Sequence, residues 1–379
     1  EEKLEAAEDL EREDYLAIYY GISLEKANVL GEIYLQLLEL HHEQAVEEGY
    51  DSYADYAYER IFVRDYDVDE TKKMLREIRN KGARFITAVD LLSSDHPNDY
   101  GSVTGDDTET YEMLLPYMED IDPEIGASLR HLLDCGLYDL DYDEKKVGST
   151  GYTIGLTSYG DCFIFDQPYN AYNDLFTYVH EFGHYHHNTH DTAGFLDAVN
   201  NIDVDEIHSQ GMEMLFTKYY PEIYGEEMGK DLEFLEVSGL VGAIPDIAVT
   251  AEFEIYAHEH AGKVTVEELN KEFLKLFGDY GYSFPDTWDQ LPLWVNTPHL
   301  FTSPNYYISY LTSAMTSLEI YNLSHRDRKE AVEKYMELTA YPGSAAYSAV
   351  VEETGLSDIF DKGVSSEILR DTYRFLKYD

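Results

Sequence analysis

The residues most able to do chemistry form the run His180-Glu181-Phe182-Gly183-His184. In a helix, histidines four residues apart lie on one face with their imidazoles converging. Glu181 projects about 100° further round the axis, so it lies beside a metal held by that pair. Two imidazoles and an adjacent carboxylate make a zinc hydrolase, because the carboxylate can take a proton from a metal-bound water. We therefore predict a catalytic zinc site here, although manganese or cobalt can use the same ligands.

A catalytic zinc site also needs a third protein ligand and an open position. One candidate is His190, which completes the spacing of a metzincin-type protease. That pattern requires a glycine at position 187, where the chain turns, whereas this sequence has His187, which lets the helix continue. The other candidate is Glu206, at the start of the next predicted helix, where it could instead complete a capping box with Asp203. The residues alone leave both ligands open.

The elements that must position these residues are mostly helices. Apolar residues recur at helical spacing from residue 1 to about 92, and again from about 170 nearly to the end. A polar loop is predicted over 95–110. Glycine-punctuated apolar runs over 148–166 predict strands and turns. The predicted fold class is mainly α, a large helical metallopeptidase fold with one small antiparallel sheet before the HExxH helix.

Gly183 is unusual because glycine inside a helix costs about 1 kcal/mol relative to alanine. Close approach of a second element to the metal-binding helix would account for it. Two other groups carry less weight. His258 with His260, and Glu252 with Glu254, are interpreted as solvent-facing positions on a charged helix.

The charge balance excludes some partners. The chain has 379 residues, of which 27 are Lys or Arg and 76 are Asp or Glu, giving a net charge of -49. Nucleic acid and anionic membrane surfaces both need a positive patch, so neither is expected as a partner. No run approaches the roughly 18 consecutive apolar residues of a spanning helix. A salt-adapted surface is an alternative explanation of the charge.

Cysteine usage and the first residues of the chain bear on the compartment. Cys135 and Cys162 fit no metal or redox motif, and we expect two buried free thiols. The chain begins at Glu1 without a methionine or a signal-peptide pattern, so we expect its natural start to lie further upstream. The cytoplasm is the favoured compartment, with secretion left open. The oligomeric state is not indicated.

The motif and its neighbours resemble a known family, the thimet oligopeptidase and oligoendopeptidase F family of zinc metallopeptidases. The run 180–187 fits the family pattern HExGHxxH, which accounts for both Gly183 and His187. The family's third ligand is a glutamate followed closely by Ser-Gln, and Glu206 with Ser209-Gln210 is similar. The resemblance, which extends from about residue 15 to about 375, therefore implies one zinc ion per chain, held by His180, His184 and Glu206.

The resemblance also implies substrate-binding residues. The segment 163–165 resembles the family's edge strand, which lies along the bound peptide backbone. His299 matches a substrate-contacting histidine, and Tyr310 matches the main tyrosine that stabilises the tetrahedral intermediate. Tyr306 or Tyr307 would be a second such tyrosine, and the spacing does not decide between them.

The implied function is zinc-dependent endopeptidase activity on internal bonds of short peptides, by attack of a zinc-bound water with Glu181 as general base. Residues 1–140 would form a helical part of the channel wall, and residues 141–379 the zinc-bearing catalytic region. Relatives usually carry a further N-terminal helical region, which helps to wall the channel that limits substrates to short peptides. The alternatives are a metzincin-type protease using His190 and an acidic, His-rich binding protein without turnover, although pure metal storage would not need Glu181.

Overall fold

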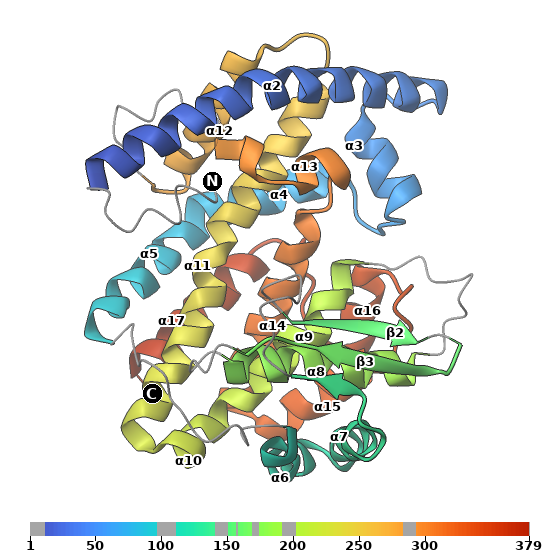
Figure 1. The fold of residues 1–379 in the computed structure, drawn as a ribbon, viewed down its shortest axis with the longest axis vertical. Coiled ribbons are helices and arrows are strands. Elements are labelled where there is room, and N and C mark those ends of the chain that lie inside the picture. The colour runs from blue at the N-terminus through green and yellow to red at the C-terminus, as the bar shows by residue number, and fades with distance from the viewer. Residues whose placement is uncertain are drawn as a thin grey trace. The chain divides into compact units, whose positions relative to one another are not determined.

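The computed structural model describes residues 12–96, 111–140, 151–156, 158–168, 174–191, 202–282 and 293–378. Within these ranges helices predominate, as expected for the mainly α class (Figure 1). The first helices are α2 (Arg12–Glu47), α3 (Tyr53–Tyr56), α4 (Val68–Glu77), α5 (Ala83–Leu92), α6 (Tyr111–Ile121) and α7 (Pro123–Cys135). Those that follow the strands are α8 (Asp174–His190), α9 (Ile202–Phe216), α10 (Tyr220–Tyr224), α11 (Glu226–Glu259), α12 (Val266–Asp279), α13 (His299–Thr302), α14 (Ile308–Arg326), α15 (Arg328–Thr339), α16 (Tyr347–Thr354) and α17 (Val364–Tyr378). Much of the predicted 95–110 loop lies outside the described residues.

The chain divides into two compact units, each built from two separate stretches of sequence. Unit 1 comprises residues 1–79 and 245–308, and unit 2 comprises residues 80–244 and 309–379. Helix α11 contributes to both units, because Pro245 lies inside it. We expected a boundary at residue 140 between the channel wall and the catalytic region. The two compact units have other boundaries and do not test that division by function, so it stays a prediction.

Unit 1 has an aromatic core. The buried ring of Tyr34, on α2, lies 5.0 Å from Trp294 and 5.3 Å from Phe301 between ring centroids. Trp294 is fully buried, and its indole N–H donates to Asn270 Oδ1 at 2.6 Å. Phe253 of α11 also contacts Trp294, so residues more than 200 positions apart share one core.

Unit 2 is organised around the pair α8 and α9, which pack against each other, while α8 also contacts α7 and the sheet (Figure 1). Phe182 and Ile207, one from each helix, are fully buried. Helix α15 packs on α9, and the hydroxyl of the buried Tyr335 donates to the carbonyl oxygen of His208 at 2.6 Å. This core fixes the position of the helix that carries the HExxH motif.

The small sheet has three strands, β1 (Tyr138–Asp139), β2 (Tyr152–Leu156) and β3 (Asp161–Phe165), in the order β1-β3-β2. β2 and β3 are antiparallel, as expected, with Tyr152 opposite Phe165 and Leu156 opposite Asp161. The two-residue β1 pairs with β3 in parallel, so the sheet is mixed and not wholly antiparallel. The pairing also places β3 between two strands and leaves β2 at an edge.

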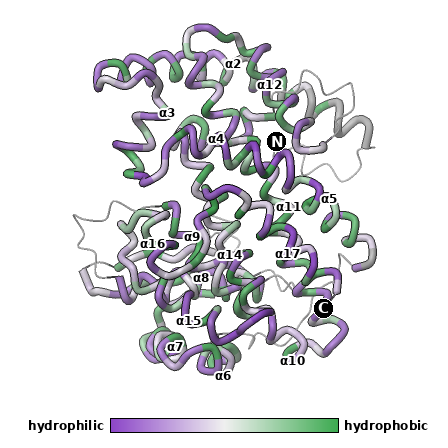
Figure 2. The backbone as a smooth tube through the Cα atoms, turned by 180° about the vertical axis from the view of Figure 1, so that it is seen from behind, coloured by the Kyte–Doolittle hydropathy of each residue, from purple (hydrophilic) through white to green (hydrophobic). Residues whose placement is uncertain are grey.

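Local sequence explains several helix boundaries. Asp122 caps α7 by accepting the N–H of Glu124, Pro123 occupies the first helical turn, and Gly136 ends the helix at a φ of 63°. Along α17 the buried positions follow helical spacing, and hydrophilic and hydrophobic residues alternate (Figure 2). The buried positions of α17 are Ser365, Ile368, Leu369 and Thr372.

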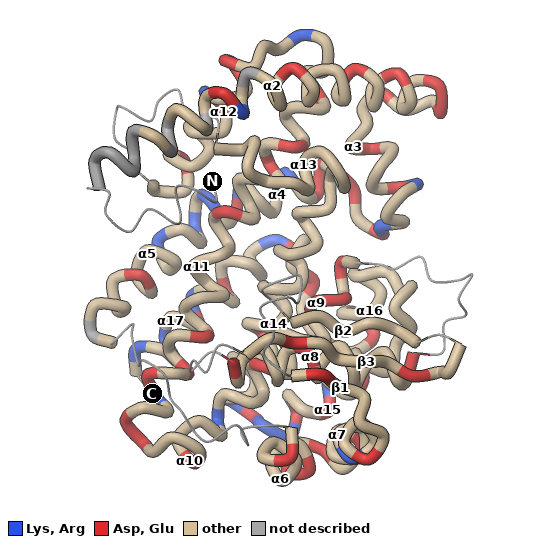
Figure 3. The backbone as a smooth tube through the Cα atoms, in the orientation of Figure 1, with Lys and Arg blue, Asp and Glu red and all other residues tan. Residues whose placement is uncertain are grey.

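Charge and hydropathy show two whole-chain features. Acidic residues are spread along helices of both units, and basic residues are far fewer (Figure 3). Among the described residues, α11 alone is long and apolar enough to cross a membrane by length and composition. Within its most apolar window 56% is buried inside the protein, and a core helix gives the same signal.

Candidate metal centre

Helix α8 presents His180 and His184 on one face. Both side chains are half-buried, and their ring centroids lie 5.1 Å apart at an interplanar angle of 78°. The helix runs without interruption to His190, as predicted from the histidine at position 187. Because the two imidazoles are one helical turn apart, they can converge on a single ion.

Helix α9 brings Glu206 to this pair, and Gly183 makes the approach possible. A Cβ at position 183 would lie 2.5 Å from the carbonyl oxygen of His208 and 2.7 Å from the Cα of Ser209. Real side chains do not tolerate such contacts with backbone atoms. The prediction that Gly183 marks the close approach of another element is confirmed.

The three side chains fit a zinc ion. Glu206 Oε2 lies 3.3 Å from His180 Nε2 and 3.4 Å from His184 Nε2. With metal–ligand distances of about 2.0–2.2 Å, tetrahedral geometry requires ligand atoms about 3.3–3.5 Å apart. His180, His184 and Glu206 are also the group of possible metal ligands found among the described residues. Two imidazoles and one carboxylate leave a fourth position for water or substrate.

A second layer of side chains orients the ligands. His180 Nδ1 lies 2.5 Å from Glu213 Oε1, which directs Nε2 toward Glu206. A carboxylate behind a metal-binding histidine fixes the ring orientation and raises its basicity. The hydroxyl of Ser209 donates to Glu206 Oε2 at 2.9 Å. His184 has a weaker counterpart, since its Nδ1 lies 3.9 Å from Asp205 Oδ1.

Glu181 lies next to the ligands and is held from the sheet. Its side chain is buried, and Thr153 Oγ1 on β2 donates to its Oε2 at 2.8 Å. A Cβ at Gly151 would lie 2.9 Å from Glu181 Cγ, so the chain entering β2 runs directly over this carboxylate. The sheet thereby fixes where the proposed base points.

The electrostatics of the group are strongly coupled. Burial alone would lower the pKa of His180, but the carboxylates of Glu213 and Glu206 outweigh it and raise that pKa well above its usual value. Burial would raise the pKa of Glu206, but hydrogen bonds with His180 and His184 hold it far below its usual value. For Glu181 burial dominates and raises the pKa, against the lowering effect of the two nearby imidazoles. A carboxylate with a raised pKa is suited to accepting and returning a proton.

The remaining histidines of α8 point elsewhere. His190 is exposed, with its Nδ1 2.7 Å from the carbonyl oxygen of His186 and its Nε2 3.4 Å from Glu124 Oε1. The buried His186 contacts Ser128 Oγ at 2.9 Å. His187 donates to the carbonyl oxygen of Thr339 at 3.1 Å. The arrangement therefore favours Glu206 over His190 as the third ligand.

The residues expected to bind substrate lie in two places. His299, Tyr306 and Tyr307 belong to unit 1, where the ring of His299 stacks on Tyr306 at 5.3 Å and meets Tyr307 edge-on at 5.5 Å. Tyr310 belongs to unit 2, half-buried in the first turn of α14. The structure thus groups the first three as one aromatic cluster, and their predicted roles stay predictions.

The comparisons with known proteins address the family. No family model matches the sequence. Over 242 residues the chain is 26% identical to the oligoendopeptidase F homolog of Borreliella burgdorferi, a match that takes in 62% of this chain and 40% of that protein. The chain therefore spans less than half the length of this curated relative.

Solved structures agree over nearly the whole chain. PZ peptidase A with inhibitor 2 gives a TM-score of 0.79 at 20% identity, covering 97% of this chain and 69% of that one. A crystal structure assigned to oligoendopeptidase F gives 0.80 at 19% identity, covering 97% and 68%. The chain has the oligoendopeptidase F fold. The predicted resemblance and the mainly α fold class are confirmed.

Within this oligoendopeptidase F fold, the predicted edge strand is wrong. The segment 163–165 belongs to β3, which has a strand on each side. Among the described strands, β1 and β2 are the edge strands, and β2 is the longer of the two. Its Tyr152 and Ile154 are each 45% exposed. The apolar run 163–165 predicts a strand but does not show whether that strand lies at the edge or in the middle of the sheet. Its neighbouring strands decide this, and they come from other parts of the chain.

Three further interpretations are wrong. Cys135 is exposed, so only Cys162 is a buried free thiol. Glu254 and His258 are buried at 1% and 2% exposure and do not face solvent. The sequence around Glu254 and His258 does not indicate that they are buried. The residues that cover them come from α2 and from the segment after α13.

Two residues that contact the candidate site of this oligoendopeptidase F fold were not anticipated, Glu213 and Thr153. Glu213 follows Glu206 by seven residues, which is two helical turns, so its position on the same face could have been inferred. Thr153 gave no such signal, because it reaches Glu181 only through the folding of the sheet onto α8.

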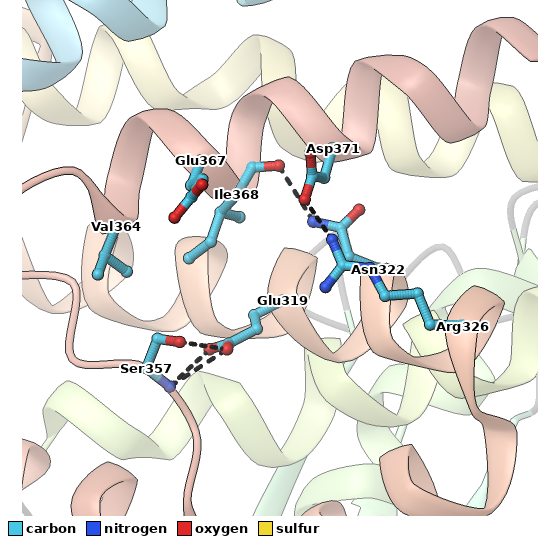
Figure 4. A pocket seen from close by; sticks show the side chains of 8 residues that line it. All are labelled: Glu319, Asn322, Arg326, Ser357, Val364, Glu367, Ile368 and Asp371. Carbon is cyan, nitrogen blue, oxygen red and sulfur yellow. Dashed lines mark hydrogen bonds and ion pairs between the residues drawn. The ribbon is translucent and has the colours of Figure 1, made fainter.

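A separate cavity of about 300 Å³ lies in unit 2, between α14 and α17 (Figure 4). Its charged groups already have partners. Arg326 bonds to Asp371, and Glu319 accepts the N–H and the hydroxyl of Ser357. Its lining residues do not include the metal ligands.

Proposed function

We propose that this chain is a zinc-dependent endopeptidase of the oligopeptidase type, with the ion held by His180, His184 and Glu206. One observation carries the proposal. Glu206 Oε2 on α9 lies at the ligand separations of a tetrahedral zinc site from the Nε2 atoms of His180 and His184 on α8, and the buried Glu181 is adjacent on α8. The likeness to oligoendopeptidase F and PZ peptidase A supports peptides as the substrate class.

Zinc, when bound, would polarise a water molecule and the scissile carbonyl. Glu181 would take the proton from the attacking water and pass it to the leaving amine as the C–N bond breaks. Thr153 would keep the Glu181 carboxylate in place through its 2.8 Å hydrogen bond. The Tyr310 hydroxyl would donate a hydrogen bond to the oxygen that gains negative charge.

The exposed edge of β2 is the proposed place for the peptide backbone. An extended peptide can add to a sheet edge through main-chain hydrogen bonds. β2 carries Thr153, which touches Glu181, so a peptide along this edge would lie next to the base. This assigns to β2 the role that the resemblance gave to 163–165.

Digestion of a peptide library of mixed lengths tests the proposal. We expect cleavage of internal bonds that stops when a chelator removes the metal and returns when zinc is added. Glu181→Gln should bind zinc as the wild type does and lose roughly 100- to 10,000-fold in rate, because it lacks the base. Chelator-insensitive cleavage, or full activity in Glu181→Gln, would refute the mechanism.

The third ligand can be tested without reference to activity. We expect Glu206→Ala to lose bound zinc, because two imidazoles alone hold the ion weakly. His190→Ala is the matched control, since His190 lies on the same helix and should leave the zinc content unchanged. The opposite pattern would favour the metzincin-type site.

A further inference from the structure

Glu254 is a buried carboxyl group of unit 1 that the proposed chemistry does not use. It lies on α11 with 1% of its surface exposed. Its Oε1 accepts the backbone N–H of Asn305 at 2.7 Å, and the backbone N–H of Tyr307 donates to the same carboxyl group. One side chain therefore holds the main chain on both sides of Tyr306.

The segment it holds is a tight turn. Asn305 is 2% exposed and has a φ of 68°, in the left-handed region that few non-glycine residues adopt. The N–H of Tyr306 donates to the carbonyl oxygen of Ser303 at 3.1 Å, which closes the turn between α13 and α14. The turn carries Tyr306 and Tyr307 against the ring of His299.

Packing alone does not explain a glutamate at this position. Burial of the carboxyl group raises the pKa of Glu254 to about 8, even though two backbone N–H groups and the charge of Arg64 lower it. Burying such a group costs free energy that an apolar side chain of the same size would not cost. Glutamate offers in exchange an acceptor that reaches two N–H groups of the turn.

We propose that Glu254 is a positioning residue, which fixes the turn 303–307 and thereby the orientation of Tyr306 and Tyr307. The inference rests on the proposed function and on the family resemblance, which implies that His299 and one of these two tyrosines contact the peptide. It predicts that the acceptor atom is what matters, and that the negative charge is not required. Glu254→Gln keeps an acceptor oxygen of the same reach, whereas Glu254→Met keeps the size without it.

The first test measures the turn itself and does not depend on catalysis. We expect the amides of Asn305 and Tyr307 to exchange hydrogen roughly ten- to a hundredfold faster in Glu254→Met than in the wild type. Glu254→Gln should stay within about threefold. Glu252→Met is the matched control, because Glu252 lies two residues earlier on α11 and bonds to Arg79 instead. If Glu254→Met does not fold, Glu254→Asp replaces it, since its shorter side chain withdraws the acceptor.

The second test links the turn to turnover. Per bound zinc, we expect kcat to fall roughly tenfold or more in Glu254→Met with KM little changed, and to be restored in Glu254→Gln. Glu254→Met is then combined with Tyr306→Phe or with Tyr307→Phe. For the tyrosine that acts through this turn, the loss of kcat in the double variant should be smaller than the product of the two single losses. The same cycle thus identifies which tyrosine contributes.

Each outcome has a definite meaning. Unchanged exchange in Glu254→Met, an equal loss in Glu254→Gln, or multiplicative effects with both tyrosines would overturn the positioning role. A wild-type chain without peptidase activity would refute the proposed function instead. The exchange measurement would then still decide whether Glu254 fixes the turn.

Discussion

At the level of single residues, His180 and Glu181 of the proposed site are each held by a side chain from another element. Glu213 fixes the ring of His180 from α9, and Thr153 fixes the carboxylate of Glu181 from the sheet. Such outer contacts decide ring orientation and basicity, and losing one typically costs 10- to 100-fold in metal affinity or activity. The proposed catalytic constellation is therefore larger than the motif from which it is inferred.

Tyr310 is the residue whose role rests most on resemblance, so it offers a sharp test. Removing a hydrogen-bond donor to the developing oxyanion typically costs about 100- to 1,000-fold in rate. We expect Tyr310→Phe to lose kcat by that order while its zinc content, measured by atomic absorption, stays at the wild-type value. Tyr159→Phe is the control, because Tyr159 is 85% exposed. Equal turnover in the two variants would remove Tyr310 from the mechanism.

The grouping of the proposed metal ligands on α8 could be predicted from the sequence because helix geometry ties spacing to position. His180 and His184 must share a face wherever the helix lies. Glu206 could be preferred over His190 only through the family resemblance, since no local rule brings the second helix back to the first. Glu254 was misjudged for the same reason, because its partners lie about fifty residues away in sequence.

At the level of elements, the centre depends on how closely α8 and α9 pack. Gly183 allows α9 to approach, and α9 supplies both Glu206 and Glu213. The separation of two helices thus sets the separation of the ligands. A change at a residue that binds nothing should therefore alter metal affinity.

We expect Gly183→Ala to weaken zinc binding and to lower the free energy of unfolding by about 1–3 kcal/mol, because its methyl group would meet backbone atoms of α9. Gly239→Ala is the matched control, since Gly239 lies inside α11 with open space around it. That change should leave zinc binding intact and be neutral or stabilising by up to about 1 kcal/mol. Chelator competition and denaturant unfolding provide the two measurements. Identical behaviour of both variants would contradict the packing argument.

The contact between α11 and α2 predicts a pH dependence. His258 Nε2 lies 3.3 Å from His41 Nδ1, and burial, with His41 nearby, lowers the pKa of His258 to about 3. In the unfolded chain His258 binds a proton near pH 6.5, whereas in the folded chain it stays neutral until the pH approaches 3. The free energy of unfolding should therefore fall by up to about 1.4 kcal/mol per pH unit as pH drops from 6.5 toward 3.

His258→Gln should remove this contribution, so the difference in stability between wild type and variant should change with pH in that window. Urea unfolding at several pH values measures it. His42→Gln is the control, because His42 is an exposed neighbour on α2. Parallel curves for His258→Gln and His42→Gln would show that the buried histidine does not titrate on unfolding.

The positions of helices and strands could be predicted from the sequence, but the order of the strands in the sheet could not. Helical stretches follow from the spacing of apolar residues, and the strands from glycine-bounded apolar runs, so both the class and the sheet were anticipated. Strand order was not, because the pairing partner of β3 at Tyr138–Asp139 is a two-residue strand with no pattern of its own. The unforeseen strand order moved the proposed peptide-binding edge from 163–165 to β2.

At the level of the whole molecule, the dominant quantity is a net charge of -49. Like charges repel in the compact state more than in an expanded chain, and salt screens them over about 10 Å at 0.1 M. The surface ion pairs among described residues, such as Lys271–Glu267 at 2.7 Å, are too weak to reverse this trend.

We therefore expect the free energy of unfolding to rise as NaCl increases from 0.05 to 0.5 M. We also expect basic peptides to be cleaved faster than acidic ones at low salt, and this preference to shrink as salt is added. Thermal unfolding and paired peptide assays measure the two effects, with KCl as a control for ion identity. Stability that falls with salt would mean that specific ion pairs outweigh the net charge.

The two-stretch construction of unit 1 has a consequence for synthesis on the ribosome. Residues up to 79 are made before the second stretch, and partners such as His258 for His41 and Phe253 for Tyr34 lie beyond residue 245. At about 5–20 residues per second, the first stretch waits roughly ten to thirty seconds for the second. During that time the α2 residues that contact α11 in the folded protein, such as Tyr34 and His41, are uncovered. A nascent chain of this design therefore has a period in which chaperone binding competes with self-association.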